Sequence, residues 1–221
     1  MTRLTLMRSV CAALLSVVAA ASTSFAQECA ATPLLGGRAS AGLSVGHASQ
    51  ESAGAASVTA AVGARLRVSG TYRATRLEDV DRLRHEGDVQ ATLPMSWHAF
   101  ALCPAAGASA ARLSTDRSGV AGRVTTRDGW IGAEVSRSVS LPHALALTPF
   151  VQPMLVRRAV SWRSSQGGWI VDDHESRTSG QTWLGVSLAT RRNAAIARLR
   201  SASGGAPSEM EIGVVTRLGG R

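Results

Sequence analysis

Residues 66–75 read LRVSGTYRAT, and their alternation decides the fold class. Every second residue from Leu66 is apolar, aromatic or small, whereas the residues between them are Arg67, Arg73 and three hydroxyl-bearing side chains. Successive side chains of a β-strand point to opposite faces of its sheet. The stretch therefore predicts a strand with one face against apolar surroundings and the other against water.

The same two-residue period recurs farther along the chain, for example over 131–136, 184–191 and 210–218. Together these runs predict an all-β chain of about ten strands, with eight as the alternative count. The predicted strands cover 38–47, 55–63, 66–76, 87–96, 99–111, 120–137, 144–160, 180–191, 194–202 and 209–219.

Short and long connections alternate between the predicted strands. An outer-membrane barrel has tight turns on its periplasmic side and longer loops outside. Because an unpaired backbone group in hydrocarbon costs several kcal/mol, a membrane-spanning sheet has to close. We therefore predict a closed, antiparallel, up-and-down transmembrane β-barrel. The short connections lie near 64–65, 97–98, 138–143 and 192–193, and the long ones cover 77–86, 112–119, 161–179 and 203–208.

In each predicted strand, the positions that alternate with the apolar ones form a polar face. This face carries many of the charged residues. An arginine that faced lipid at mid-membrane would cost about 2–4 kcal/mol, so these side chains should point inward. Buried charges are tolerated when they are partnered, which predicts a paired network that fills the lumen and makes it a poor channel. Strict alternation also turns Trp130 and Trp183 inward. The predicted network consists of Arg67, Arg73, Asp88, Glu134, Arg198, Glu211 and Arg217.

Prolines interrupt several predicted strands, and two of them share one parity, Pro149 and Pro153. Proline has no backbone N–H, and a closed barrel has no free edge on which to place it. The two missing donors should face the same neighbouring strand, so that a bulge or water at one seam can absorb the loss.

The first 26 residues have the order of a secretory signal peptide: Arg3 and Arg8, an apolar stretch over 9–21, and a small-residue pattern that ends at Ala26. We therefore expect a cleaved signal peptide over 1–26 and a barrel domain over 27–221, delivered to the outer membrane. An uncleaved anchor is the alternative, although the apolar stretch is shorter than the roughly 20 residues that a spanning helix needs.

Cleavage would remove Cys11 and leave two cysteines, Cys29 and Cys103. An oxidising compartment favours a disulfide between them, which would close a loop of about 75 residues. Two separate buried thiols are the alternative.

The charge of the chain is strongly positive, and all 24 basic residues are arginines. Without Arg3 and Arg8, 22 arginines face 15 acidic residues, a net charge of +7. The arginines are spread along a secreted chain, so we expect no nucleic-acid partner; anionic outer-membrane lipid and lipopolysaccharide are the expected partners of a monomer.

Taken together, the signal peptide, the alternating strands and the unequal connections resemble the small outer-membrane β-barrel proteins, the porin-like class that includes the OmpA transmembrane domain and OmpX-like barrels. The resemblance covers nearly all of the chain after residue 26 and is architectural. It implies a scaffold whose outer loops are available for contact with surfaces or solutes.

Candidate chemistry is confined to the long connections. Two groups of acidic residues and histidines resemble in composition the Asp/His sets of barrel proteases and acyltransferases. The first is Asp172, Asp173, His174 and Glu175, and the second is Asp79, Asp81 and His85. Acid–base catalysis requires a histidine within hydrogen-bond reach of its partner, which composition does not provide. No GxSxG, HExxH, CxxC or EF-hand spacing occurs, so we expect no catalytic residue, cofactor or metal.

The expected function is therefore that of a non-enzymatic integral outer-membrane barrel with a side-chain-filled lumen. Two alternatives stay open. A soluble periplasmic β-barrel would place the charges on its surface and bind a small apolar ligand inside. An outer-membrane barrel enzyme would use the Asp/His set of the outer loops.

Overall fold

The structure, a computed structural model, describes residues 29–30, 38–48, 51–63, 65–77, 82–117, 120–166, 169–202 and 209–218. Apart from one 3-10 turn at Pro142–Ala144, the regular elements in this part of the chain are β-strands, and no helix in it is long and apolar enough to span a membrane. The strands are β1 (Ala39–Ala48), β2 (Glu51–Val62), β3 (Leu66–Leu77), β4 (Arg82–Thr92), β5 (Met95–Trp97), β6 (Phe100–Arg117), β7 (Val120–Ser136), β8 (Val139–Leu141), β9 (Leu145–Gln166), β10 (Trp169–Ala189), β11 (Asn193–Ala202) and β12 (Glu209–Leu218).

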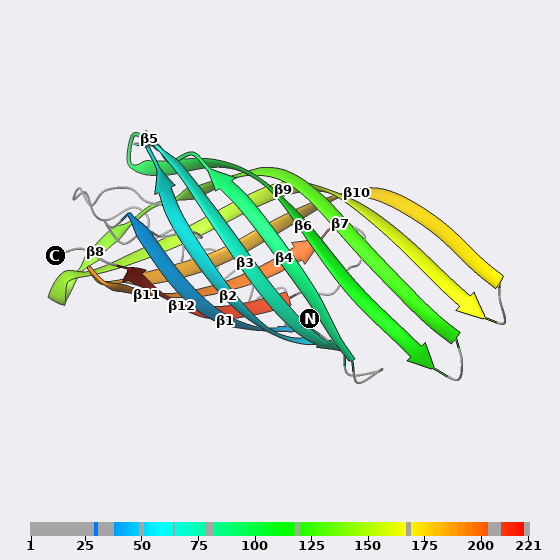
Figure 1. Cartoon of the computed structure of the whole chain (residues 1–221). Coiled ribbons are helices and arrows are strands. Elements are labelled where there is room, and N and C mark those ends of the chain that lie inside the picture. The colour runs from blue at the N-terminus through cyan, green and yellow to red at the C-terminus, as the bar shows by residue number, and fades with distance from the viewer. Residues whose placement is uncertain are drawn as a thin grey trace, which may run out of the picture.

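Ten of the twelve strands in the described part of the chain close into a ring (Figure 1). Each ring strand pairs antiparallel with its neighbours in sequence, and β1 pairs with β12 from Ala39 opposite Leu218 to His47 opposite Met210. The short strands β5 and β8 lie outside the ring, paired with β6 and β9. The prediction of a closed up-and-down barrel of about ten strands is confirmed.

The two ends of the barrel differ. We call the end at which β1 begins and β12 ends the terminal end, and the opposite end the hairpin end. Strands β6, β7, β9 and β10 have 18, 17, 22 and 21 residues, whereas the other ring strands have 10 to 12. The β6–β7 and β9–β10 hairpins therefore extend past the rest of the barrel at the hairpin end (Figure 1).

This extension corrects the predicted long loops at 112–119 and 161–179. The β9–β10 ladder runs unbroken from Ala146 opposite Ala189 to Gln166 opposite Trp169, and the β6–β7 ladder reaches Arg117 opposite Val120. Strand β4 begins at Arg82, so most of the predicted loop 77–86 is strand as well. Charged residues suit these strand ends because both faces of an extension outside the membrane can meet water.

The barrel wall separates side chains by parity, as the alternation predicts. Side chains at the polar positions of each ring strand line the cavity inside, and side chains at the alternating apolar positions face outward. Leu43 and Val45 are each 66% exposed and Ile131 is 62% exposed, values unusual for a soluble sheet. Outward large apolar side chains include Leu43, Val45, Val58, Val89, Ile131, Leu155, Leu184, Leu188, Leu199, Met210, Ile212 and Val214.

The interruption beside Pro149 and Pro153 falls on one seam of the ring, between β7 and β9. The β7–β9 ladder pairs Gly132 with Met154 and Val135 with Val151, but the two positions between them, next to Pro153, are not paired. The β9–β10 ladder beside the same proline is continuous. Pro149 still contributes to the β7 side through its carbonyl oxygen, which accepts a hydrogen bond from Arg137 N at 3.3 Å.

Candidate functional site: the barrel lumen

A disulfide fastens the start of the described chain inside the barrel. Cys29 and Cys103 are bonded, with their Cα atoms 6.0 Å apart, and both are buried. Cys103 lies on the inward parity of β6 near the terminal end. The predicted disulfide is confirmed, and it places Cys29 and Ala30 within the lumen rather than on the outer surface.

Ala30 makes two further contacts inside the barrel. Its backbone N–H donates a hydrogen bond to Glu134 Oε1 at 2.6 Å, and Glu134 is only 2% exposed. Its side chain packs with the inward rings of Phe150 and Trp183, against which Met154 and Ile196 also lie. These residues and the disulfide lie together at the terminal end of the lumen, against the consecutive strands β6, β7, β9 and β10, and we call them the N-terminal floor.

Above the floor lies a cavity of about 500 Å³. Its lining reaches from Ser40 and Gln152, next to the floor, to Glu51, Arg84 and Arg158 at the hairpin end. The cavity is mostly lined by polar and charged side chains. This lining argues against the alternative of a soluble barrel with an apolar ligand in its interior, because burial of an apolar ligand there would strip water from charges.

A network of five charged residues occupies one side of this cavity. Arg73 contacts both Glu209 and Glu211, with Nη2 of Arg73 2.9 Å from Oε2 of Glu211. Arg198 bonds Glu211 at 2.8 Å, and Arg200 bonds Glu209 at 2.5 Å. The side chains of both glutamates are only 8% exposed. We call these residues the arginine–glutamate network.

Trp183 supports the network from the floor. The guanidinium carbon of Arg198 lies 4.5 Å from the ring centroid of Trp183, and that of Arg200 lies 5.5 Å away. An indole face attracts a cation, the more strongly where water is excluded. The network and the N-terminal floor are therefore in contact through one ring, which joins the terminal end of the lumen to its charged wall.

The seven predicted network residues do not all meet. Arg73, Arg198 and Glu211 lie together, and Asp88 lines the same cavity, where Trp130 hydrogen-bonds its carboxylate. Glu134 instead holds the N-terminal residues, and Arg67 and Arg217 lie on the terminal-end portions of β3 and β12. Each ring strand is about ten residues long or longer, so two inward charges can lie at different heights along the barrel axis. Alternation alone does not specify that height.

Sequence reasoning missed two members of the network, Glu209 and Arg200. Both share parity with residues that it identified, since Glu209 stands two positions before Glu211 and Arg200 two after Arg198. The strand register places Arg198 opposite Glu211 and Arg200 opposite Glu209. Opposite charges at matched positions of a predicted hairpin were the available signal.

A second set of ion pairs lies at the hairpin end of the cavity. Arg158 forms a forked contact with Asp128, with Nη2 2.6 Å from Oδ2 and Nε 3.0 Å from Oδ1. Arg84 lies 3.3 Å from Glu51. The first pair joins the neighbouring strands β7 and β9, whereas the second joins β2 and β4 on either side of β3.

The Asp/His residues weighed as catalytic candidates are dispersed. Asp172 pairs with Arg163 on the β9–β10 extension, the Asp173 carboxylate accepts the backbone N–H of His174, and His85 meets Tyr72 OH at 2.6 Å. The described residues contain no group of three or more metal-ligating side chains. Asp79 and Asp81 lie outside the described residues.

Side chains on the outer wall determine whether lipid or water surrounds the barrel. A band of exposed aliphatic residues surrounds a closed ring whose interior is charged, which is the reverse of a soluble barrel. The fold is that of the small outer-membrane β-barrel proteins. The signal-peptide prediction concerns residues 1–26, which lie outside the described part of the chain.

No protein-family model matches the sequence, and a search of curated proteins finds no match. Among solved structures, the chain is similar to LpxR from Salmonella typhimurium, with 10% identity and a TM-score of 0.47 over 81% of this chain and 100% of that one. It is similar to Ail of Yersinia pestis, with 11% identity and a TM-score of 0.38 over 82% and 99%.

A bacterial polysaccharide outer membrane secretin is also similar, with 13% identity and a TM-score of 0.43 over 76% of this chain. The chain spans 57% of the secretin's length. At these identities the likeness concerns the fold alone.

Proposed function

We propose that the chain is a non-enzymatic integral outer-membrane protein whose barrel is closed to solutes. In this proposal the terminal end faces the periplasm, and the hairpin end projects the β6–β7 and β9–β10 extension outside the cell. The extension then serves as a surface for contact with solutes or other surfaces, since function on such scaffolds resides in what projects from them.

The observation that carries the proposal is the N-terminal floor. A disulfide, a buried hydrogen bond to Glu134 and packing against Phe150 and Trp183 hold residues 29–30 inside the lumen. Above them, the arginine–glutamate network narrows the remaining space with charges that neutralise one another. A conducting pore needs a continuous water path, and this arrangement supports a lumen in which that path is interrupted.

The absence of enzymatic function rests on a different argument. Two carboxylates of the extension are engaged by neighbours, since Asp172 pairs with Arg163 and the Asp173 carboxylate accepts the backbone N–H of His174. A general base must reach a substrate proton within hydrogen-bond distance, and the partners of the His47 and His85 rings are hydroxyl groups, of Ser52 and Tyr72, rather than carboxylates.

Two measurements test the proposal. Refolded protein should migrate differently on a denaturing gel with and without boiling, because a closed barrel resists the detergent. In planar lipid bilayers it should give no steady single-channel conductance. Stable open channels of the unmodified protein would contradict the closed lumen, and identical gel mobility would contradict the membrane barrel itself.

A further inference from the structure

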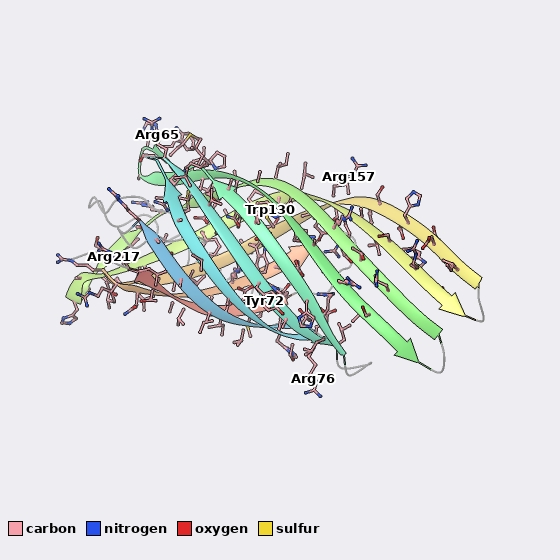
Figure 2. All side chains as sticks on the ribbon, in the orientation of Figure 1. Arg65, Tyr72, Arg76, Trp130, Arg157 and Arg217 are labelled. Atoms are coloured by element: carbon pink, nitrogen blue, oxygen red, sulfur yellow. A yellow bond between two sulfur atoms is a disulfide. The ribbon has the colours of Figure 1, made fainter. Side chains whose placement is uncertain are left out.

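Among the exposed outward arginines toward the hairpin end, three lie on the adjacent strands β6, β7 and β9: Arg112, Arg127 and Arg157. All three are exposed and lie on the outward parity of their strands. Figure 2 shows Arg157 extending away from the barrel. We call these residues the outer arginine patch.

The register brings the three side chains together. Arg127 stands opposite Ala110, two residues from Arg112, and opposite Ala159, two residues from Arg157. Each arginine is thus a diagonal neighbour of the next across adjacent strands. Diagonal residues on one face of a sheet lie about 7–8 Å apart, within reach of side chains as long as arginine.

The patch lies at the upper edge of the apolar band. On β6 the outward positions before Arg112 are alanines, on β9 the preceding outward residue is Leu155, and on β7 the outward positions beyond Arg127 lead to Ile131. Arginine on the lipid face costs several kcal/mol at mid-membrane but almost nothing near the interface. The three guanidinium groups therefore stand at headgroup height.

These guanidinium groups lack the compensation that the lumen arginines have. Within the described residues, none of the three has an ion-pair or hydrogen-bond partner. The nearby carboxylates are committed elsewhere, since Asp128 faces inward to Arg158 and Asp172 pairs with Arg163. A cluster of three positive charges at a lipid interface attracts an anionic group.

We propose that the outer arginine patch binds the phosphate groups of a phosphorylated glycolipid of the outer leaflet, the lipid A portion of lipopolysaccharide. The guanidinium fork matches phosphate oxygens two at a time. The glycolipid's acyl chains would then lie against the outward aliphatic residues directly below. This inference rests on the proposed function, because it requires the hairpin end to face the outer leaflet.

The test compares two triple variants of the full chain refolded in zwitterionic detergent. The first triple variant, the patch variant, removes the patch and combines Arg112→Gln, Arg127→Gln and Arg157→Gln. The second triple variant is the control and combines Arg65→Gln, Arg191→Gln and Arg192→Gln. It removes three exposed arginines at the terminal end and changes the net charge by the same amount. Binding of bisphosphorylated lipid A is measured by calorimetry against dephosphorylated lipid A and inorganic phosphate.

We expect the patch variant to bind bisphosphorylated lipid A roughly 100-fold more weakly, because each basic side chain near an anionic surface contributes about fivefold. The control variant should stay within about threefold of the unmodified protein. Dephosphorylated lipid A should not distinguish the variants. Replacing the patch residues by lysine should restore part of the affinity, since charge returns without the planar fork.

Equal binding by the patch variant and the control would overturn the inference, as would inorganic phosphate binding the patch as tightly as lipid A. Boiled and unboiled gel mobility is recorded for every variant. If boiled and unboiled samples of the unmodified protein migrate alike, the proposed function is refuted. If the mobility shift is present but lipid binding is not selective, only this inference is refuted.

Discussion

Glu211 shows how a single side chain organises the charged wall of the lumen. Its two carboxylate oxygens contact different arginines, Oε1 with Arg198 and Oε2 with Arg73. Its neighbour of equal parity, Glu209, contacts Arg73 and Arg200. Each glutamate therefore neutralises arginines from two strands on opposite sides of β12, and the network ties β3, β11 and β12 together across the barrel.

Replacing Glu211 by glutamine should destabilise the barrel by about 3 kcal/mol, because the change leaves the largely buried guanidinium group of Arg198 without a carboxylate and that of Arg73 with Glu209 alone. The measurement is the urea midpoint of refolded protein in detergent. Glu51→Gln is the matched control, since the side chains of Glu51 and Arg84 are 38% and 31% exposed and such pairs contribute less than about 1 kcal/mol. Equal destabilisation by both variants would contradict the role assigned to burial.

Gly107 provides room for an inward ring. It stands directly opposite Trp130, and a Cβ at this position would lie 2.5 Å from Trp130 Cε2. Gly107→Val should therefore displace the indole, break its hydrogen bond to Asp88 and cost about 1–3 kcal/mol, with a shift in tryptophan fluorescence. Gly54→Val is the control, because nothing lies within 4 Å of a Cβ built there. Unchanged fluorescence in Gly107→Val would count against this placement of Trp130.

At the scale of the element, the long hairpins are the feature that sequence reasoning misjudged. Alternation predicted ten strands because lipid and lumen impose opposite polarity on successive residues of every spanning segment. Beyond the membrane this contrast ends, so the charged residues of 161–179 carried no strand signal and were interpreted as loop. The strand β4 was shifted for the same reason, since Arg84 and Glu86 alternate with His85 in a highly charged run.

The candidate site was predictable only in part, for a related reason. Parity places Arg73, Arg198 and Glu211 inside, but their height along the barrel depends on register, which turn lengths set only approximately. The position of residues 29–30 inside the lumen has no periodic signature. The disulfide itself was predicted, whereas the floor that it anchors depends on which side of the wall Cys103 faces and on the fit of Ala30 to Phe150.

The Arg163–Asp172 pair makes the β9–β10 extension sensitive to acid. A hydrogen bond from Arg163 lowers the pKa of Asp172 below its ordinary value. A depressed folded pKa contributes stability that is present above the unfolded value of about 4 and is lost as pH falls through the folded pKa.

We therefore expect amide exchange in the outer part of this hairpin to quicken as pH falls below about 4, after correction for intrinsic exchange. Arg163→Gln should raise the pKa of Asp172 in a carboxyl-detected NMR titration. Arg177→Gln, an exposed arginine on the other face of the same hairpin, should leave that titration unchanged. A pKa of Asp172 that is the same in all three proteins would show that the pair does not persist in solution.

At the scale of the whole molecule, one covalent bond links the N-terminal residues to a ring that is already complete without them. All ten ring strands pair with two neighbours, so the barrel does not need the disulfide to close. The bond instead fixes the N-terminal floor. Wall and floor are thus separable parts, which makes the closed lumen testable independently of the fold.

Cys29→Ser with Cys103→Ser should keep the gel mobility shift of a folded barrel but lower its stability, by up to about 4 kcal/mol for a loop of this length. Without the bond, one hydrogen bond to Glu134 and the contacts of Ala30 must hold the floor against the entropy of a free segment. We therefore expect intermittent conductance in planar bilayers, which the unmodified protein should show only after addition of reductant. The double variant should not respond to reductant, and this lack of response is the control for effects on the bilayer. If the variant stays closed, the arginine–glutamate network and the inward rings occlude the lumen by themselves, and the floor is not the barrier.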